Sequence, residues 1–388
     1  MVPKGWTTKA LGRSINLQGG FAFKSSEFGE LGIPIVRISN IQGEIVELDG
    51  APCYEEDIKL ERFLLEDGDI LIAMSGATTG KTGRFFASNS TPNAYLNQRV
   101  GRFQIKDENL LCSDFVWHLI STERFQYLVS IEAIGGAQPN VSGAEIESLT
   151  FNFPPITEQR KIAEILSTWD RAVEVAEAQL EAARTSKRAL MQQLLTGKRR
   201  FPEFEAEEWK EVRLGDVCAP KQWPTIGKND MTDSGYPVFG ANGFIGFYSE
   251  FNHEHPTTVV TCRGATCGTV SRTPPSTYIT GNAMSLDDVD ATRVDDEFLF
   301  FALQKRGFDD IISGSAQPQI IGKDIRSVKL KLPMLTEQRK IAETLSICDS
   351  DVVNIENQIT KLRTEKKALM QQLLTGKRRV VVEGCHEV

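Results

Sequence analysis

The stretch SGATTGKTG, from Ser75 to Gly83, brings glycines and a lysine together much as a phosphate-binding loop does. That motif needs about four residues between its first glycine and the Gly-Lys pair. Here Gly76 and Gly80 enclose only three. A related stretch, RGATCGTV, begins at Arg263 and lacks the lysine. The spacing therefore favours a glycine-containing turn between strands, with a nucleotide site around Lys81 as the alternative.

Histidine and cysteine side chains could bind zinc or act in catalysis. His253, His255, Cys262 and Cys267 have an H-x-H and a C-x4-C spacing, which is looser than that of a zinc site. His118 has no neighbour in the sequence that completes a Ser-His-Asp or Cys-His arrangement. We therefore expect no bound metal and no catalytic residues in this chain.

Basic and amide side chains offer a different chemistry, the recognition of nucleic acid. Arginine pairs with guanine, and asparagine or glutamine with adenine, in the major groove, while lysine contacts phosphates. The residues predicted to contact DNA are Lys24, Arg37, Lys81, Arg84, Arg99 and Gln138 in the first half, and Lys221, Asn242, Arg263, Arg272, Gln317 and Lys323 in the second. The KRR clusters at 198–200 and 377–379 either contact phosphates or complement a helix C-terminus.

An internal repeat organises these residues. Residues 157–200 and 336–379, which are 179 positions apart, are identical at 29 of 44 positions. The related GAT stretches at Gly76 and Gly264 are 188 apart, and Trp6 and Trp209 are 203 apart. The second copy is therefore shorter by 203 − 179 = 24 residues. A duplicated unit with loops of different length predicts one scaffold that carries two different surfaces.

Each copy has the pattern of a strand-rich domain followed by a long helix. Short β-branched runs such as PIVRISNI, GDILIAM and TTVVTC predict strands, whereas SDFVWHLISTERFQYLVS and DEFLFFALQKRGFDDII have helical spacing. The sequence predicts an α+β protein with a domain at 1–153, a long helix at 154–200, a second domain at 201–332 and a second long helix at 333–380.

Both long helices carry an apolar seam with steps of three and four residues, the heptad pattern of a coiled coil. The seam positions are Ile162, Leu166, Trp169, Val173, Leu180, Leu190 and Leu194 in the first helix, and Ile341, Leu345, Val352, Ile355, Ile359, Leu362, Leu369 and Leu373 in the second. Lys187 and Lys366 interrupt the seams, where they either fix the register or extend to solvent.

The ends and the direction of the long helices can also be predicted. Thr157 and Thr336 are expected N-caps, and Gly197 and Gly376 are expected left-handed residues at the C-terminal ends. A helix of about 40 residues is about 60 Å long, whereas the second domain has a radius of gyration of about 14 Å. Because that domain cannot carry the chain back along the helix, we expect an antiparallel pair with approximate two-fold symmetry.

Composition narrows the class of protein. The sequence lacks both the apolar core of a signal peptide and a membrane-length apolar run, so we expect a cytoplasmic protein. Seven cysteines without a C-x-x-C pair indicate reduced thiols. A net charge of -8 argues against nonspecific polyanion binding by the whole surface, although a local basic face remains compatible with it.

The doubled P-x-x-TEQRKIAE…LMQQLLTGKRR motif, each copy preceded by GAT and AQP, resembles the specificity subunit of a type I restriction-modification system. YPVFGANGFIG in the second copy adds to this resemblance, which covers essentially the whole chain. It implies two target recognition domains, held apart by two antiparallel helices, that read the halves of a bipartite, asymmetric DNA site. It says nothing about the base sequence.

The resemblance also implies partners. Two methyltransferase subunits, which carry S-adenosylmethionine and methylate adenine, would dock on the helices, and ATP- and Mg-dependent restriction subunits would join them. The chain itself would bind double-stranded DNA, bind no cofactor and contact no membrane. A self-sufficient nuclease or ATPase and a coiled-coil adaptor that binds only proteins remain as alternative functions.

Overall fold

The computed structural model describes residues 2–88, 91, 93–133, 139–241, 243–314 and 317–381. The chain forms two compact units, Met1–Val175 with Ile359–Val388 (unit 1) and Ala176–Gln358 (unit 2). Each unit therefore contains half of both long helices, α4 (Ile156–Leu194) and α7 (Leu335–Leu373). None of the helices in the described ranges combines the length and apolar character needed to cross a membrane.

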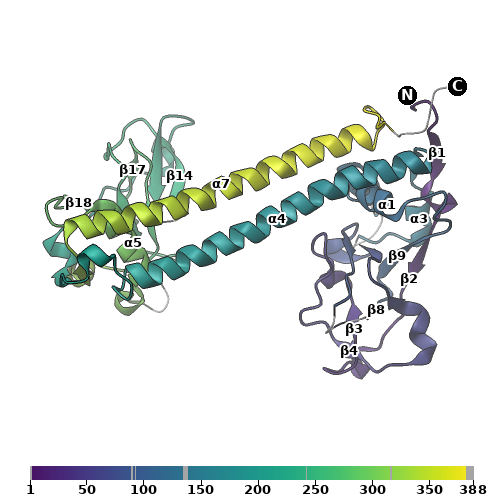
Figure 1. Cartoon of the computed structure of the whole chain (residues 1–388), viewed down its shortest axis with the longest axis horizontal. Helices are drawn as coiled ribbons and strands as arrows, with labels where there is room; N and C mark the ends of the chain where they lie inside the picture. Colours follow the sequence, from purple (N-terminus) through teal and green to yellow (C-terminus); the bar gives the residue numbers. More distant parts are fainter. Residues whose placement is uncertain are drawn as a thin grey trace. The chain divides into compact units, whose positions relative to one another are not determined.

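Unit 1 contains two four-stranded sheets (Figure 1). The first has the order β2 (Ile15–Gly19), β9 (Val100–Ile105), β6 (Ile70–Ala73) and β7 (Thr82–Arg84). The second, which we call the small sheet of unit 1, has the order β4 (Cys53–Tyr54), β3 (Ile33–Val36), β8 (Ala94–Leu96) and β5 (Leu64–Leu65). A separate antiparallel pair joins β1 (Thr7–Ala10) to β10 (Thr150–Phe153).

Alternating side chains place a core on each face of the first sheet. Leu71, Ala73 and Val100 join residues of the small sheet in one buried apolar cluster. Ile70 and Ile72 face the opposite way, into a second cluster. That cluster also receives residues from α1 (Ser113–Ile120), α2 (Glu123–Glu132), α3 (Gly143–Ser148), the first half of α4 and the last half of α7.

Unit 2 repeats this plan with fewer strands. Its four-stranded sheet has the order β12 (Ala219–Gln222), β18 (Ala283–Asp287), β15 (Thr258–Thr261) and β16 (Val270–Arg272). The small sheet of unit 2 has the order β14 (Gly243–Tyr248), β13 (Tyr236–Gly240) and β17 (Tyr278–Ile279). Unit 2 also contains an antiparallel pair of strands, β11 (Lys210–Arg213) and β19 (Lys329–Leu332). Its shorter helices are α5 (Asp296–Arg306) and α6 (Gly322–Ser327).

The two predicted helical stretches inside the domains end for different local reasons. SDFVWHLISTERFQYLVS forms α1 and α2 instead of one helix, because the Thr122 hydroxyl caps α2 by accepting from the Phe125 amide at 3.2 Å. DEFLFFALQKRGFDDII is helical only to Arg306, since Gly307 takes a φ of 68°.

The long helices begin at Ile156 and Leu335, one residue before the predicted caps, so Thr157 and Thr336 are not N-caps. Gln159 donates its amide to the Pro155 carbonyl at 3.0 Å, which makes Pro155 the first acceptor of α4. At the other ends, Gly197 and Gly376 have φ angles of 68° and 69°, as predicted for left-handed residues.

Every predicted seam residue is buried or half-buried. In unit 1, Ile162 and Leu166 of α4 share a cluster with Leu373 of α7. In unit 2, Leu194 of α4 shares a cluster with Ile341 and other residues of α7. Off the seam, residues near the helix ends pack on their own domain core, whereas Val175 is 56% exposed.

The repeated TEQRK motif ties the start of each long helix to its unit. In unit 1, Arg379 donates to both carboxylate oxygens of the buried Glu158, at 2.7 and 2.8 Å. In unit 2, Arg200 does the same to Glu337 at 2.9 and 2.6 Å. The last arginine of each KRR cluster is therefore a partner of a buried glutamate, which neither of the two predicted roles anticipates.

The adjacent glutamines hold the helices α1 and α5. Gln159 accepts from the Cys112 amide at 3.0 Å, and Gln338 accepts from the Asp295 amide at 2.9 Å. Each side chain also donates to two backbone carbonyls. A buried amide with all these bonds formed fixes the orientation of the neighbouring helix.

Both seam lysines form ion pairs across the helix pair. Lys187 pairs with Asp349 inside unit 2, and Lys366 pairs with Asp170 inside unit 1. All four side chains are at most about a third exposed. A partly buried pair of this kind favours the role in register over simple extension to solvent.

Candidate nucleic-acid interface

In unit 1, the turn after β6 lies at one end of the strands of the first sheet. Gly76 and Gly80 have φ angles of 77° and 86°, a region that favours glycine. The amide of Gly76 donates to the Pro139 carbonyl at 2.9 Å, and the amide of Met74 donates to the Arg99 carbonyl at 2.9 Å. These bonds bring separate stretches of the chain to the turn.

The Thr78 hydroxyl adds a further segment by donating to the Ile38 carbonyl at 3.2 Å. Four segments therefore meet here, 37–42, 74–81, 97–99 and 139–141, and we call them the GAT edge of unit 1. A rigid turn that gathers loops from several strands is a common arrangement for a recognition surface.

Unit 2 builds its GAT edge with matching bonds. The amide of Gly264 donates to the Pro318 carbonyl at 3.0 Å, and the amide of Cys262 donates to the Asn282 carbonyl at 3.1 Å. The Thr266 hydroxyl donates to the Ala241 carbonyl at 3.2 Å. Its segments are 240–241, 262–268, 280–282 and 317–319.

Several residues predicted for unit 1 come together at this edge. Arg99 and Lys81 are exposed, and the Lys81 ammonium donates to the Gln42 side chain at 3.1 Å. Arg37 is half-buried, and its Nε has no hydrogen-bond partner in the described part of the chain. Gln138 lies outside the described residues, directly before Pro139.

Lys24 and Arg84 are engaged elsewhere. Lys24 is exposed and pairs with Glu27 at 3.2 Å. Arg84 pairs with Asp114 at the start of α1 at 2.6 Å, with its guanidinium 5.2 Å from the centre of the Trp117 ring. The half-buried Arg84 therefore joins β7 to α1, and its contact with DNA stays a prediction.

The residues predicted for unit 2 divide in the same way. Arg263 and Gln317 are exposed on the GAT edge, and Lys323 is exposed on α6, which follows the 317–319 segment. Arg272 pairs with Asp296 of α5 at 2.6 Å, so its role matches that of Arg84. The remaining two are Lys221, exposed at the end of β12, and Asn242, which lies outside the described residues.

Some residues that lie at or beside the GAT edges were not predicted from the sequence. Gln42 and Gln222 lie at equivalent edges, and the Gln222 amide donates to the Cys262 thiol and the Gly281 carbonyl. In unit 2, Phe244 and Ile245 follow the edge segment on β14 and are 52% and 43% exposed. Alignment of the loops that follow Pro34 and Pro237 would have drawn attention to Gln42, Phe244 and Ile245, although not to Gln222.

The nucleotide-site alternative loses its chemical basis in this turn. A phosphate-binding loop needs free backbone amides that point at the phosphate. Here the amides of Thr79, Gly80 and Lys81 donate to the carbonyls of Gly76, Ala73 and Thr78. These three amides are therefore not free to bind a phosphate, and the Lys81 side chain donates to Gln42.

The four residues with a loose zinc spacing do not converge. His253 contacts Asp287, while Cys262 accepts from Gln222. No group of three or more His, Cys, Asp and Glu side chains suited to a metal occurs within the described ranges. Burial lowers the pKa of His118 to about 4, with a smaller opposing effect of Asp170, so this histidine is neutral near pH 7.

Comparison with known proteins agrees with this architecture. The type I restriction modification DNA specificity domain matches residues 3–183 and 206–362. A protein of Methanocaldococcus jannaschii, assigned as the MjaX type I restriction enzyme specificity subunit, is 26% identical over 98% of this chain and 95% of its own length. The MjaVIII specificity subunit of the same organism is 30% identical over 51% of this chain and 47% of its own length.

Solved structures share the fold. The crystal structure of the type I restriction-modification S subunit from M. genitalium has a TM-score of 0.66 at 18% identity and covers 96% of both chains. A chain from a study of complex assembly and conformational transition of the type I R-M system has a TM-score of 0.59 at 17% identity and covers 97% of this chain and 100% of its own. Because the family match spans both strand-rich domains, the chain belongs to the type I restriction-modification specificity subunits and has the role of a DNA-specificity subunit.

Proposed function

We propose that each GAT edge reads one half of a bipartite, asymmetric DNA site. The observation that supports this is the repetition of one hydrogen-bonded edge with different side chains on it. The Thr78 and Thr266 bonds hold equivalent segments, yet one edge carries Arg37 and Lys81 and the other carries Arg263. Because arginine, lysine and amide groups differ in the base edges and phosphates they contact, the two half-sites should differ in sequence.

We further propose that α4 and α7 form an antiparallel coiled coil that sets the distance between the half-sites. Two ion pairs in unit 1 support this, because Glu158 pairs with Arg379 and Asp170 pairs with Lys366. The residue number rises along α4 as it falls along α7. The pairs Glu337–Arg200 and Asp349–Lys187 repeat the order in unit 2, which also supports an approximate two-fold relation.

In this proposal the chain is not an enzyme. Adenine methylation would come from two modification subunits that carry S-adenosylmethionine and dock on the helices, and cleavage from restriction subunits that use ATP and Mg. Exposed apolar side chains on the long helices, such as Val175, Ile347 and Val353, support a protein partner there.

Mapping methylated adenine in the host DNA by single-molecule sequencing tests the proposal. We expect a two-part motif with an unread gap and different halves. A duplex that carries this motif should bind the purified chain, and the affinity should fall steeply with salt because phosphate contacts release counterions. A continuous palindrome, or binding that does not depend on salt, would contradict the proposal.

The alternative functions need a separate measurement. If Lys81 held a nucleotide, Lys81→Ala would abolish ATP binding by the isolated chain. We expect neither the native chain nor the variant to bind ATP, methylate DNA or cleave it. Activity of the isolated chain would replace the noncatalytic proposal with a self-sufficient enzyme.

A further inference from the structure

The small sheet of unit 2 is attached to its domain differently from the small sheet of unit 1. In unit 1, sixteen buried apolar residues join the small sheet to the other sheet. In the described part of unit 2, the corresponding cluster contains Val259, Ile279 and Ala283 alone. Val238 on β13 is also fully buried, but these few side chains bury far less apolar surface than the sixteen in unit 1, so polar contacts contribute more in unit 2.

The segment Asn252–His253 provides these contacts on the side of the small sheet. His253 and Thr277 exchange backbone hydrogen bonds of 3.0 and 2.9 Å. The Asn252 side chain pairs with the backbone of Ile279, since its Oδ1 accepts from the amide at 2.8 Å and its Nδ2 donates to the carbonyl at 2.9 Å. This double pairing determines which end of the Asn252 amide group is the oxygen.

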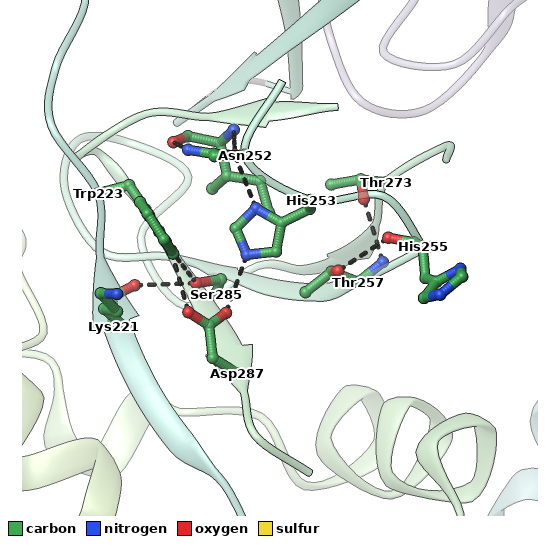
Figure 2. Close-up of polar contacts among 10 residues, drawn as sticks. Lys221, Trp223, Asn252, His253, His255, Thr257, Thr273, Ser285 and Asp287 are labelled. Carbon is green, nitrogen blue, oxygen red and sulfur yellow. Dashed lines mark hydrogen bonds and ion pairs between the residues drawn. The ribbon is translucent and has the colours of Figure 1, made fainter. Parts of the chain in front are cut away.

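The His253 ring then crosses to the four-stranded sheet (Figure 2). Its Nδ1 lies 2.7 Å from Asn252 Oδ1, an oxygen that can only accept, so Nδ1 carries a proton. Its Nε2 lies 2.9 Å from Asp287 Oδ1 on β18. An ionised carboxylate can also only accept, so both contacts are donated hydrogen bonds when the ring carries both protons.

Asp287 has the surroundings of an ionised group. Burial alone raises the pKa of its carboxyl, but hydrogen bonds from His253, Ser285 and Trp223 outweigh burial and lower the pKa below its ordinary value. Trp223 Nε1 donates to Asp287 Oδ2 at 3.0 Å, and the Trp223 and His253 rings meet edge to face with centroids 5.3 Å apart. Figure 2 shows Trp223 and His253 pointing toward this carboxylate.

The other charged and titratable groups nearby have other partners or are exposed. On β12, the Lys221 ammonium lies 3.7 Å above the Trp223 ring. On β17, the Tyr278 hydroxyl donates to a backbone carbonyl. Glu254 and His255, on the same segment as His253, are exposed. The contact of His253 with Asp287 therefore joins the two sheets of unit 2 through two titratable side chains.

We propose that doubly protonated His253 is the positioning residue that holds the small sheet of unit 2 in place at the GAT edge. The link to the edge is Ala241, which follows β13 and whose carbonyl accepts from the Thr261 and Thr266 hydroxyls at 2.8 and 3.2 Å. When Nε2 loses its proton, its lone pair faces the carboxylate of Asp287. The small sheet then loses this contact with β18 as the pH rises and keeps its other bonds, such as those to the Ala241 carbonyl.

The effect of His253 on DNA recognition rests on the proposed function, in which the GAT edges read DNA. Recognition of the second half-site should weaken at high pH. Recognition of the first half-site should persist, because the small sheet of unit 1 packs on an apolar cluster that does not titrate. The attachment of the sheet can be measured without DNA, which separates the two proposals.

The first experiment is hydrogen exchange of the native full-length chain without DNA, at about pH 6 and about pH 8.5. Between these two values an ordinary imidazole loses most of its proton. Protection factors corrected for intrinsic exchange should fall about tenfold for the amides of β13 and β14, the size expected when one charge-assisted hydrogen bond is lost. Those of β3 and β8 should not change. Equal behaviour of the two small sheets would overturn the inference.

Variants of the full-length chain provide the second measurement. His253→Gln removes the charge, so the protection of β13 and β14 should be low at both pH values and should no longer depend on pH. His255→Gln, which alters an exposed histidine two positions away, is the matched control and should behave as the native chain does. If His253→Gln retains the native pH dependence, the proposed role of His253 is wrong.

The third experiment uses duplexes in which one half of the mapped target is scrambled. The loss of affinity is measured relative to the duplex with both halves intact. The loss caused by scrambling the second half should be smaller at about pH 8.5 than at about pH 6. The loss caused by scrambling the first half should be the same at both pH values. If exchange depends on pH but neither scrambled half affects binding, DNA reading by the edges fails and the positioning role stands. If both halves are read and neither exchange nor binding depends on pH, the positioning role fails.

Discussion

In unit 1 the segment after β3 presents Arg37, Ser39 and Gln42, whereas in unit 2 the segment after β13 leads to the exposed Phe244 and Ile245 on β14. The backbone beneath them is the same, because a threonine of each GAT turn bonds to the equivalent carbonyl. The comparison teaches that the edge is built by backbone and threonine bonds, which leaves the presented side chains free to differ.

The two units also differ in how they satisfy the repeated glutamate. Glu158 in unit 1 accepts from Arg379 and from the indole of Trp6 at 3.1 Å. Glu337 in unit 2 accepts from Arg200, while the indole Nε1 of Trp209 is buried without a partner in the described part of the chain. Unit 2 therefore depends more heavily on its arginine.

Arg200→Ala should give the largest effect. It leaves the fully buried Glu337 carboxylate without its cation, which costs about 3–5 kcal/mol. Arg379→Ala should cost less, because Trp6 still donates to Glu158. Urea denaturation of the full-length chain measures both losses, with Lys198→Ala, at an exposed position of the same KRR cluster, as the control. Equal losses for the two arginines would contradict the contrast between the units.

Acid should destabilise unit 1 through His118, which is 1% exposed. Its pKa in the folded chain is about 4, below the ordinary value of 6.5. The unfolded chain therefore binds the proton first, and the stability contributed by the neutral ring is complete above pH 6.5 and is lost as the pH falls toward 4. Between pH 7 and pH 5 the loss should be about 2 kcal/mol.

The second unit supplies the matched variant for this test. Phe301 lies six positions after Asp295 and His118 six after Cys112, the residues whose amides donate to the equivalent glutamines. His118→Phe should therefore remove the acid-dependent loss in urea denaturation at pH 5 relative to pH 7. An unchanged loss in this variant would assign the acid sensitivity to other groups.

Arg263→Ala should weaken binding of the second half-site about tenfold, as expected for loss of a bidentate contact to a base. The first half-site should be unaffected. Titration of duplexes with one half scrambled measures this effect. Arg272→Lys is a useful contrast, because Arg272 pairs with Asp296 and should affect stability instead of base preference. A uniform loss over all sequences would make Arg263 a phosphate contact.

Lys81→Ala should have the smallest effect, a few-fold loss of affinity that is the same for all sequences. If the ammonium contacts one phosphate, the slope of log affinity against log salt should fall by about one. Salt titration of the native chain and the variant checks this. An unchanged slope would mean that Lys81 serves only Gln42, to which it donates at 3.1 Å.

Much of the architecture follows from the sequence. The heptad seam predicts the long helices, because a repeat of apolar residues has one geometric solution on a helix. The seam positions are buried or half-buried, and Gly197 and Gly376 are left-handed as their place after each helix requires. The offset of 188 between the GAT stretches correctly pairs two turns that form the same edge.

The sites were less predictable. Arg84 and Arg272 have the residue type of a DNA contact, but each pairs with an aspartate that a separate helix brings to it. The same applies to Arg200 and Arg379, whose partners lie more than one hundred residues away in the chain. A charged side chain is identified by its type in the sequence, whereas its partner depends on the packing of distant elements.

The sequence by itself determined that one unit occurs twice, that each copy ends in an amphipathic helix and that the loops have diverged, because repetition and periodicity are properties of the order of residues. Only the tertiary structure decided which charges are exposed and which are paired. It alone brought His253 to Asp287, since sheet topology, and not spacing along the chain, sets the distance between these two side chains.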